Sequence, residues 1–232
     1  MKGVLFGDKH SYKDWGLILA ERPVITPPKV KTNYIDVPNA NGSLDLTEIL
    51  SDDVKYENRE MTFKFIVLED RKRWHEIYSN IQEYLHGQEM KIILDEDRSY
   101  YYTGRCSVDD WTSSKVTSTI VIKALVEPYK LELYSSLEEW QWDDFNFESG
   151  IVRNYKDIVV NGEHELIIEG TRLQVIPSFI VDGSMSVTFN GHTYQLPAGT
   201  SKILNIVIKQ GVNTLKFIGN GKVSVDYRGG RL

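Results

Sequence analysis

Apolar residues in the first half of the chain follow more than one period. Between Met61 and Leu68 they alternate with polar or smaller residues, which is typical of a strand with one buried face. From residue 69 to 86 the spacing is that of a helix, and Gly87 suits the position just beyond a helix end. The apolar stripe of this helix must pack on a sheet, and it consists of Trp74, Ile77, Tyr78, Ile81, Tyr84 and Leu85.

Two hairpins are predicted on either side of this strand and helix. Residues 32–38 alternate and lead to Asn41-Gly42, a pair that tolerates positive φ and predicts a tight turn. Residues 99–111 and 116–127 form a longer predicted hairpin, joined by a stretch of Thr, Ser and Lys.

The pattern changes after Pro128. From residue 151, short apolar segments alternate with turn signals at the spacing of an antiparallel sandwich or jelly roll, and no helical period interrupts them. The predicted turns are Asn161-Gly162, Asp182-Gly183, Asn190-Gly191, Ala198-Gly199, Gln210-Gly211 and Asn220-Gly221. The predicted strands are Glu165–Ile168, Val175–Val181, Met185–Phe189, Ile203–Ile208, Thr214–Ile218 and Val223–Tyr227.

These patterns predict a mainly β protein with one helix and two domains. Residues 1–130 are expected to form a β-sandwich-like domain with one α-helix and a long hairpin. Residues 131–232 are expected to form an antiparallel β-sandwich. The length of 232 residues accommodates two small domains, and 13 Tyr, 8 Phe and 5 Trp favour many strands.

Composition excludes several classes of protein. The single cysteine, Cys106, rules out a disulfide scaffold and a Cys-rich zinc site. No apolar run is long enough for a transmembrane helix, and the first residues lack the apolar run of a signal peptide, so we expect folding in a reducing cytoplasm. The 27 basic and 33 acidic residues give a formal net charge of -6, which argues against a sequence-independent grip on nucleic acid.

Motifs for catalysis, cofactors or metals are absent from the sequence. The five histidines form no zinc-protease pair, no nucleophile elbow is present, and no glycine-rich loop precedes a helix. The acidic residues 95–97 lack the spacing of a calcium loop and are expected at a hairpin tip. Cys106 is expected to be a buried strand residue. We therefore expect no catalytic, cofactor-binding or metal-binding residues, and no enzyme activity.

One aromatic and acidic segment has two interpretations. Trp140 and Trp142 lie beside Asp143, Asp144 and Phe145. Aromatic rings beside carboxylates suit a sugar-binding surface, which makes Trp140 and Trp142 candidate carbohydrate contacts. The same residues could instead anchor a connection between the two domains.

The N-terminal segment combines a short apolar strand at residues 3–7 with the motif Asp14-Trp15-Gly16-Leu17. This combination resembles the start of the distal tail proteins (Dit) of siphophages. Residues 34–45 resemble the family's V-P-G-x-x-G-x-L-D turn, except that Asn39 stands where glycine is frequent. Asparagine also accepts positive φ. The resemblance covers most of residues 1–130 in order, and residues 223–230 are similar to the family's ending.

This resemblance implies a structural role in a phage or prophage tail. The N-terminal domain would form a hexameric ring at the distal end of the tail, with a galectin-like jelly roll as the outer domain. The ring would join the tail tube to the tail tip or baseplate and continue the DNA channel without binding DNA specifically. Implied partners are the tail-tube protein, the tail-tip or tail-associated lysin protein and, for host attachment, a receptor-binding protein. No cofactor and no membrane insertion are implied, and assembly would take place in the host cytoplasm.

Subunit contacts in such a ring need surfaces that recognise each other. Tyr100, Tyr101, Tyr102 and Trp111 of the long hairpin are the candidate oligomer-interface residues, because aromatic side chains are enriched at interfaces. Consecutive strand residues point to opposite faces, so at least one of the three tyrosines is expected outside the core. The alternative function is a cell-wall or glycan-binding module built on the second domain.

Overall fold

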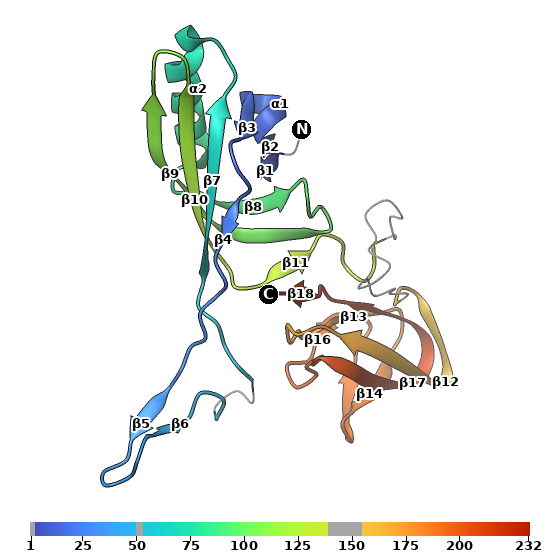
Figure 1. The fold of residues 1–232 in the computed structure, drawn as a ribbon. Coiled ribbons are helices and arrows are strands. Elements are labelled where there is room, and N and C mark those ends of the chain that lie inside the picture. Colours follow the sequence, from blue (N-terminus) through green and yellow to red (C-terminus); the bar gives the residue numbers. More distant parts are fainter. Residues whose placement is uncertain (1–2, 50–52, 139–154) are drawn as a thin grey trace. The chain divides into compact units, whose positions relative to one another are not determined.

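The computed structural model describes residues 3–49, 53–138 and 155–232 (Figure 1). The described chain is mostly β, as predicted. It divides into two compact units. The first contains Met1–Asp97, Tyr101–Lys130 and Leu232, and the second contains Arg98–Tyr100 and Leu131–Arg231.

The first unit is built on one antiparallel sheet and a helix packed against it. The central strands are β7, β9 and β10, and Thr119–Val126 of β10 pairs along its length with β7. The order across the sheet is β2-β1-β8-β9-β10-β7-β3, and β4 also pairs with β7. The bounds are β1 Val4–Phe6, β2 Lys9–His10, β3 Leu17–Leu19, β4 Val24–Ile25, β7 Arg59–Val67, β8 Glu89–Leu94, β9 Tyr100–Ser113 and β10 Ser118–Val126.

The predicted helix is present and its apolar stripe is buried. A 3₁₀ turn, η1 (Arg71–Arg73), leads into α2 (Trp74–Leu85), and Gly87 adopts a φ of 77° just beyond the helix end. Four stripe residues are buried in the core of the first unit, namely Trp74, Ile77, Ile81 and Leu85, and Tyr78 and Tyr84 pack on it partly buried. The helix therefore covers the apolar face that β7 presents through Met61, Phe63 and Phe65.

A second, short helix was not predicted. Residues Ser11–Trp15 form α1, because the ring of His10 caps its start by accepting hydrogen bonds from the backbone N–H groups of Tyr12 and Lys13. Gly16 ends the helix in the left-handed conformation, with a φ of 63°. The prediction of a single helix was therefore incomplete, because a one-turn helix held by its caps carries no 3.6-residue apolar period.

The shorter predicted hairpin is also present. β5 (Tyr34–Asp36) pairs with β6 (Ser43–Asp45) and with no other described strand. Within the connecting turn, Asn39 has a φ of 65° and Gly42 a φ of 78°. Asparagine thus holds the positive φ that the Dit-like motif needs at this position.

The second unit contains an antiparallel sheet with the order β15-β14-β17-β13-β16, in which β12 pairs with the long strand β17. Its core is lined by side chains such as Phe179, Val187 and Phe217, all fully buried. A two-strand ladder joins β11 to β18. The bounds are β11 Lys130–Glu132, β12 Ile158–Gly170, β13 Ser178–Val181, β14 Met185–Phe189, β15 His192–Leu196, β16 Gly199–Lys202, β17 Gly211–Asp226 and β18 Gly230–Arg231.

Two of the predicted turns lie inside strands. Asn161 pairs with Asn220 and Gly162 with Gly219 in the β12–β17 ladder, so neither Asn-Gly pair reverses the chain. Their glycines do adopt positive φ, at 79° for Gly162 and 139° for Gly221. At the neighbouring Gly219, an added Cβ would lie 2.6 Å from Cβ of Met185, so glycine is needed there for close approach.

The strand prediction also failed in two other ways in this unit. Ile203–Ile208 is no strand, although Ile206 and Ile208 are fully buried, and β15 and β16 were not predicted. Each error follows from what the apolar pattern does and does not report. A loop that buries apolar side chains has the same apolar sequence pattern as a strand. In contrast, β15 carries mostly polar, exposed side chains and has no such pattern.

Candidate assembly surfaces and a polar pocket

The β5–β6 hairpin belongs to a longer segment, residues 29–57, which we call the arm. Its two sides are held together near the base, where Lys31 N–H donates to the carbonyl of Lys55 and Glu57 N–H to that of Lys29, each at 2.8 Å. None of the described arm residues is buried. Its exposed apolar side chains are Val30, Tyr34, Ile35, Val37, Leu44 and Ile49.

One face of the arm is apolar. Ile35 lies directly opposite Leu44 in the ladder, and these side chains are 48% and 54% exposed. The opposite face carries Asp36 and Ser43, whose hydroxyl donates to the aspartate at 2.6 Å. A two-stranded hairpin is marginal in water unless something covers its apolar face, and no described residue does so here.

The structure places the three predicted interface tyrosines at different depths. Tyr101 and Tyr102 are buried and Tyr100 is half-buried. Each of the two buried rings is in contact with a cation from another strand. The Lys91 ammonium lies 4.6 Å from the centre of the Tyr101 ring, and the Arg59 guanidinium lies 4.9 Å from that of Tyr102. Only Tyr100 keeps substantial exposure, so it is the tyrosine that can offer contact area without a rearrangement.

Trp111 is half-buried at the other end of the same strand. Its ring stacks on Tyr78 at 4.5 Å and meets His75 edge-on at 4.8 Å, both from α2. Its indole N–H donates to the Ser118 hydroxyl at 2.6 Å. These contacts join the hairpin to the helix. The role of the four aromatics at a subunit interface stays a prediction, and the carbohydrate candidates Trp140 and Trp142 lie outside the described residues.

Arg59 is the buried charge of the first unit. Only 6% of the residue is exposed, and its Nε and Nη2 atoms have no hydrogen-bond partner in the described chain. Desolvation lowers the pKa of its guanidinium, and burial likewise raises the pKa of the neighbouring Tyr102 phenol. The contact with the Tyr102 ring thus offsets part of the cost of burying this cation.

Cys106 lies in the core of the same unit. It is fully buried in β9, and desolvation raises the pKa of its thiol to about 12. A catalytic cysteine needs the opposite shift, towards the thiolate. The expectation of a buried strand cysteine is therefore confirmed.

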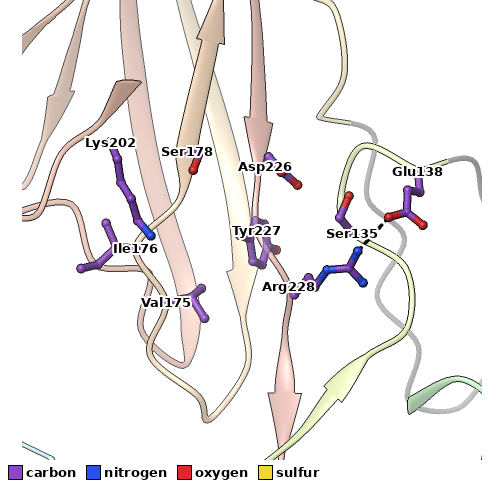
Figure 2. Close-up of a pocket in the computed structure, with 9 residues that line it drawn as sticks. All are labelled: Ser135, Glu138, Val175, Ile176, Ser178, Lys202, Asp226, Tyr227 and Arg228. Carbon is purple, nitrogen blue, oxygen red and sulfur yellow. Dashed lines mark hydrogen bonds and ion pairs between the residues drawn. The ribbon is translucent and has the colours of Figure 1, made fainter. Parts of the chain in front are cut away.

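A polar pocket of about 480 Å³ lies in the second unit (Figure 2). Lys202, Ser178 and Asp226 stand side by side on β16, β13 and β17, because Ser178 is the register partner of both others. Val175 and Ile176 line the pocket beside this row, and Ser135, Glu138, Tyr227 and Arg228 complete it.

Two kinds of charged group line this pocket. Arg228 and Glu138 form an ion pair at 2.8 Å, and Arg228 also donates to the carbonyl oxygens of Glu132 and Leu133. Asp226 differs, because its Oδ1 atom is buried and has no hydrogen-bond partner in the described chain. A half-buried carboxylate without a partner is costly unless a bound group compensates it.

Other chemistry is scarce among the described residues. They contain no group of three or more His, Cys, Asp and Glu side chains placed to hold a metal ion. No helix in the same residues is long and apolar enough to cross a membrane.

Comparison with known proteins gave a match in structure alone. No known sequence family matches the chain, and neither does any curated protein sequence. Among solved structures, the chain superposes on SPP1 Dit over 100% of both chains, with a TM-score of 0.62 and 11% sequence identity.

The chain has the fold of a siphophage distal tail protein. SPP1 Dit itself is known as a paradigm of the hub adsorption apparatus in phages that infect Gram-positive bacteria. The fold match extends over both units of the present chain and is not confined to the region of the N-terminal motifs.

Proposed function

We propose that this protein is a distal tail protein of a phage or prophage, a non-enzymatic component of the virion tail. The observation that carries the proposal is the match to the Dit fold over the full length of both chains. The finer parts of the proposal are a hexameric ring, a channel for DNA, and partners in the tail tube, in the tail tip or lysin protein, and in host attachment.

The arm supports self-assembly. Its Ile35–Leu44 face is apolar and is covered by no residue that the structure describes, whereas the equivalent face of the β9–β10 hairpin is buried. A neighbouring copy in a closed ring would cover this face, because each subunit of a ring contacts its two neighbours through two different, complementary surfaces. Tyr100 and Trp111 are the half-buried aromatics available for further contacts.

Charge supports a channel that lets DNA pass. Each chain carries a formal charge of -6, so a ring of six copies would carry about -36. Like charge repels phosphate at short range, which suits a conduit that does not hold its cargo.

The ring is tested with the full-length protein by native mass spectrometry and negative-stain microscopy. We expect a six-copy species and ring-shaped particles. Leu44→Asp should shift the mass to the monomer without changing the thermal unfolding of the first unit. Leu204→Asp is the matched control, because Leu204 is 71% exposed and lies outside both the arm and the β9–β10 hairpin. A wild-type protein that stays monomeric at every concentration would contradict the ring.

A further inference from the structure

The pocket of the second unit presents one acidic and one basic side chain without a partner among the described residues. The side chains of Asp226 and Lys202 form no hydrogen bond or ion pair with any described residue, although they lie on the same outward face of the sheet. Ser178 stands between them (Figure 2). Two strand spacings of about 4.8 Å separate the flanking backbones, and the two side chains form no ion pair with each other, which leaves room for a ligand between them.

The remaining charges of the pocket are already paired. Arg228 is held by Glu138 and by two backbone carbonyls, so this pair forms a fixed polar wall. The two basic and two acidic side chains cancel, and the pocket has no net formal charge. A charged ligand would meet a like charge at either Asp226 or Lys202, whereas an uncharged polar ligand would not.

Hydroxyl groups fit the two unused side chains. A hydroxyl can donate to the Asp226 carboxylate, and a second hydroxyl on the same ring can accept from the Lys202 ammonium. The Ser178 hydroxyl between them can do either. Val175 and Ile176 offer an apolar wall for the C–H face of a ring. Hydrogen bonds to charged groups are the stronger kind, which compensates the carboxylate that the fold leaves without a partner.

We propose that this pocket binds an uncharged sugar residue, with Asp226 accepting from one ring hydroxyl and Lys202 donating to another. The volume of about 480 Å³ lies within the range of small-molecule sites. This binding does not depend on ring formation, so it can fail or succeed separately from the proposed tail function.

The test measures sugar binding to the full-length protein by saturation-transfer difference NMR. The probes are glucose, galactose and N-acetylglucosamine, and inorganic phosphate and choline serve as charged competitors. We expect saturable binding of at least one sugar, in the millimolar range. Asp226→Asn and Lys202→Met should each weaken it about tenfold, as expected when one hydrogen bond to a charged group is lost.

Glu165→Gln is the matched control for Asp226→Asn. It removes the same charge from an exposed strand position outside the pocket and should leave binding unchanged. If Asp226→Asn fails to fold, Lys202→Met decides the outcome, because it alters an exposed side chain. Three results would overturn the proposal: no binding of any of the three sugars, sugar binding that neither variant weakens, or displacement of the sugar by phosphate or choline.

Discussion

Two hairpins of the first unit differ in whether their apolar faces are buried. In β9–β10, alternate side chains such as Cys106, Ile120 and Ile122 are fully buried beneath α2 and the neighbouring strands. In β5–β6, every side chain is exposed, including the facing pair Ile35 and Leu44. The first hairpin is stabilised by its own chain. The second has an apolar face that no described residue covers, which is the basis of its proposed role in assembly.

The largest expected difference in stability comes from truncating one apolar side chain in the sheet and one in the arm. Phe63→Ala should lower the free energy of unfolding by about 3–5 kcal/mol, because Phe63 is fully buried against Phe6 and Phe65. Leu44→Ala in the arm should change the stability of the monomer by no more than about 0.5 kcal/mol. Urea denaturation of both variants under monomeric conditions measures the difference. Equal losses would mean that the arm is packed within its own chain.

The thiol of Cys106 gives a pH-dependent test of the buried hairpin. Its pKa is raised to about 12 in the folded chain, while the unfolded thiol ionises near its ordinary value of 9.0. The unfolded state therefore loses a proton first, and stability falls as the pH rises between these values. Relative to Cys106→Ala, the wild type should lose about 1.4 kcal/mol per pH unit within that window. Denaturation curves at several alkaline pH values measure this slope, and identical slopes would contradict the raised pKa.

The same thiol can be compared with one placed in the arm. Cys106 should resist a thiol reagent in the native protein, because it is fully buried. A cysteine introduced by Leu44→Cys in a Cys106→Ala background should react at once in the monomer and become protected in the ring. Persistent reactivity in the assembled species would exclude the arm face from the subunit interface.

Substitution of Arg59 tests whether the buried charge between the arm and the sheet stabilises the folded chain. It begins β7 directly after the arm, and its Nε and Nη2 atoms have no partner in the described chain. Arg59→Met keeps most of the volume and removes the buried charge, so the free energy of unfolding should rise by about 1 kcal/mol. Arg59→Lys, which retains the charge and loses the planar stacking on Tyr102, is the control and should not stabilise. A loss of stability in Arg59→Met would show that the guanidinium is favourable where it lies.

The smallest expected difference in stability comes from removing one side-chain hydroxyl near the sheet and one in the arm. Tyr84 donates to the Phe6 carbonyl at 3.1 Å and to the Asp8 carboxylate, which lowers the pKa of Asp8. Tyr84→Phe should lower the free energy of unfolding by about 0.5–1 kcal/mol, while Ser43→Ala in the arm should leave it unchanged. Thermal melts resolve this difference. The Tyr84 effect should shrink as the pH falls through the lowered pKa of Asp8, because the protonated acid loses its advantage in the folded state.

Sequence patterns predicted the fold well where a period and a turn signal agreed. The apolar stripe from Trp74 to Leu85 and the alternating pattern of β7 are longer than the apolar patterns of loops. Both the predicted helix and the predicted strand are confirmed. The prediction failed for Asn161-Gly162 and Asn220-Gly221, which were interpreted as chain reversals. Glycine signals an unusual backbone conformation, but only the pairing of β12 with β17 shows that this conformation lies within two long strands.

The pocket could not be predicted in this way. Ser178, Lys202 and Asp226 are ordinary polar residues at outward-facing strand positions, and nothing in their local sequence distinguishes them. Strand order brings them into one row, and strand order depends on pairings between segments far apart in the chain. The same limit applies to Tyr101 and Tyr102, which are buried on opposite faces of β9 and meet cations from other strands, Lys91 and Arg59.

The amino-acid sequence by itself determined a mainly β chain, the helix, the main hairpins and a resemblance to distal tail proteins, because these depend on local periods and on short motifs. Tertiary structure alone decided which apolar faces are covered, which charges stay without partners in the described chain, and which distant polar residues share a pocket. Burial and pairing are properties of several segments at once, and the energies that fix them arise only when those segments meet.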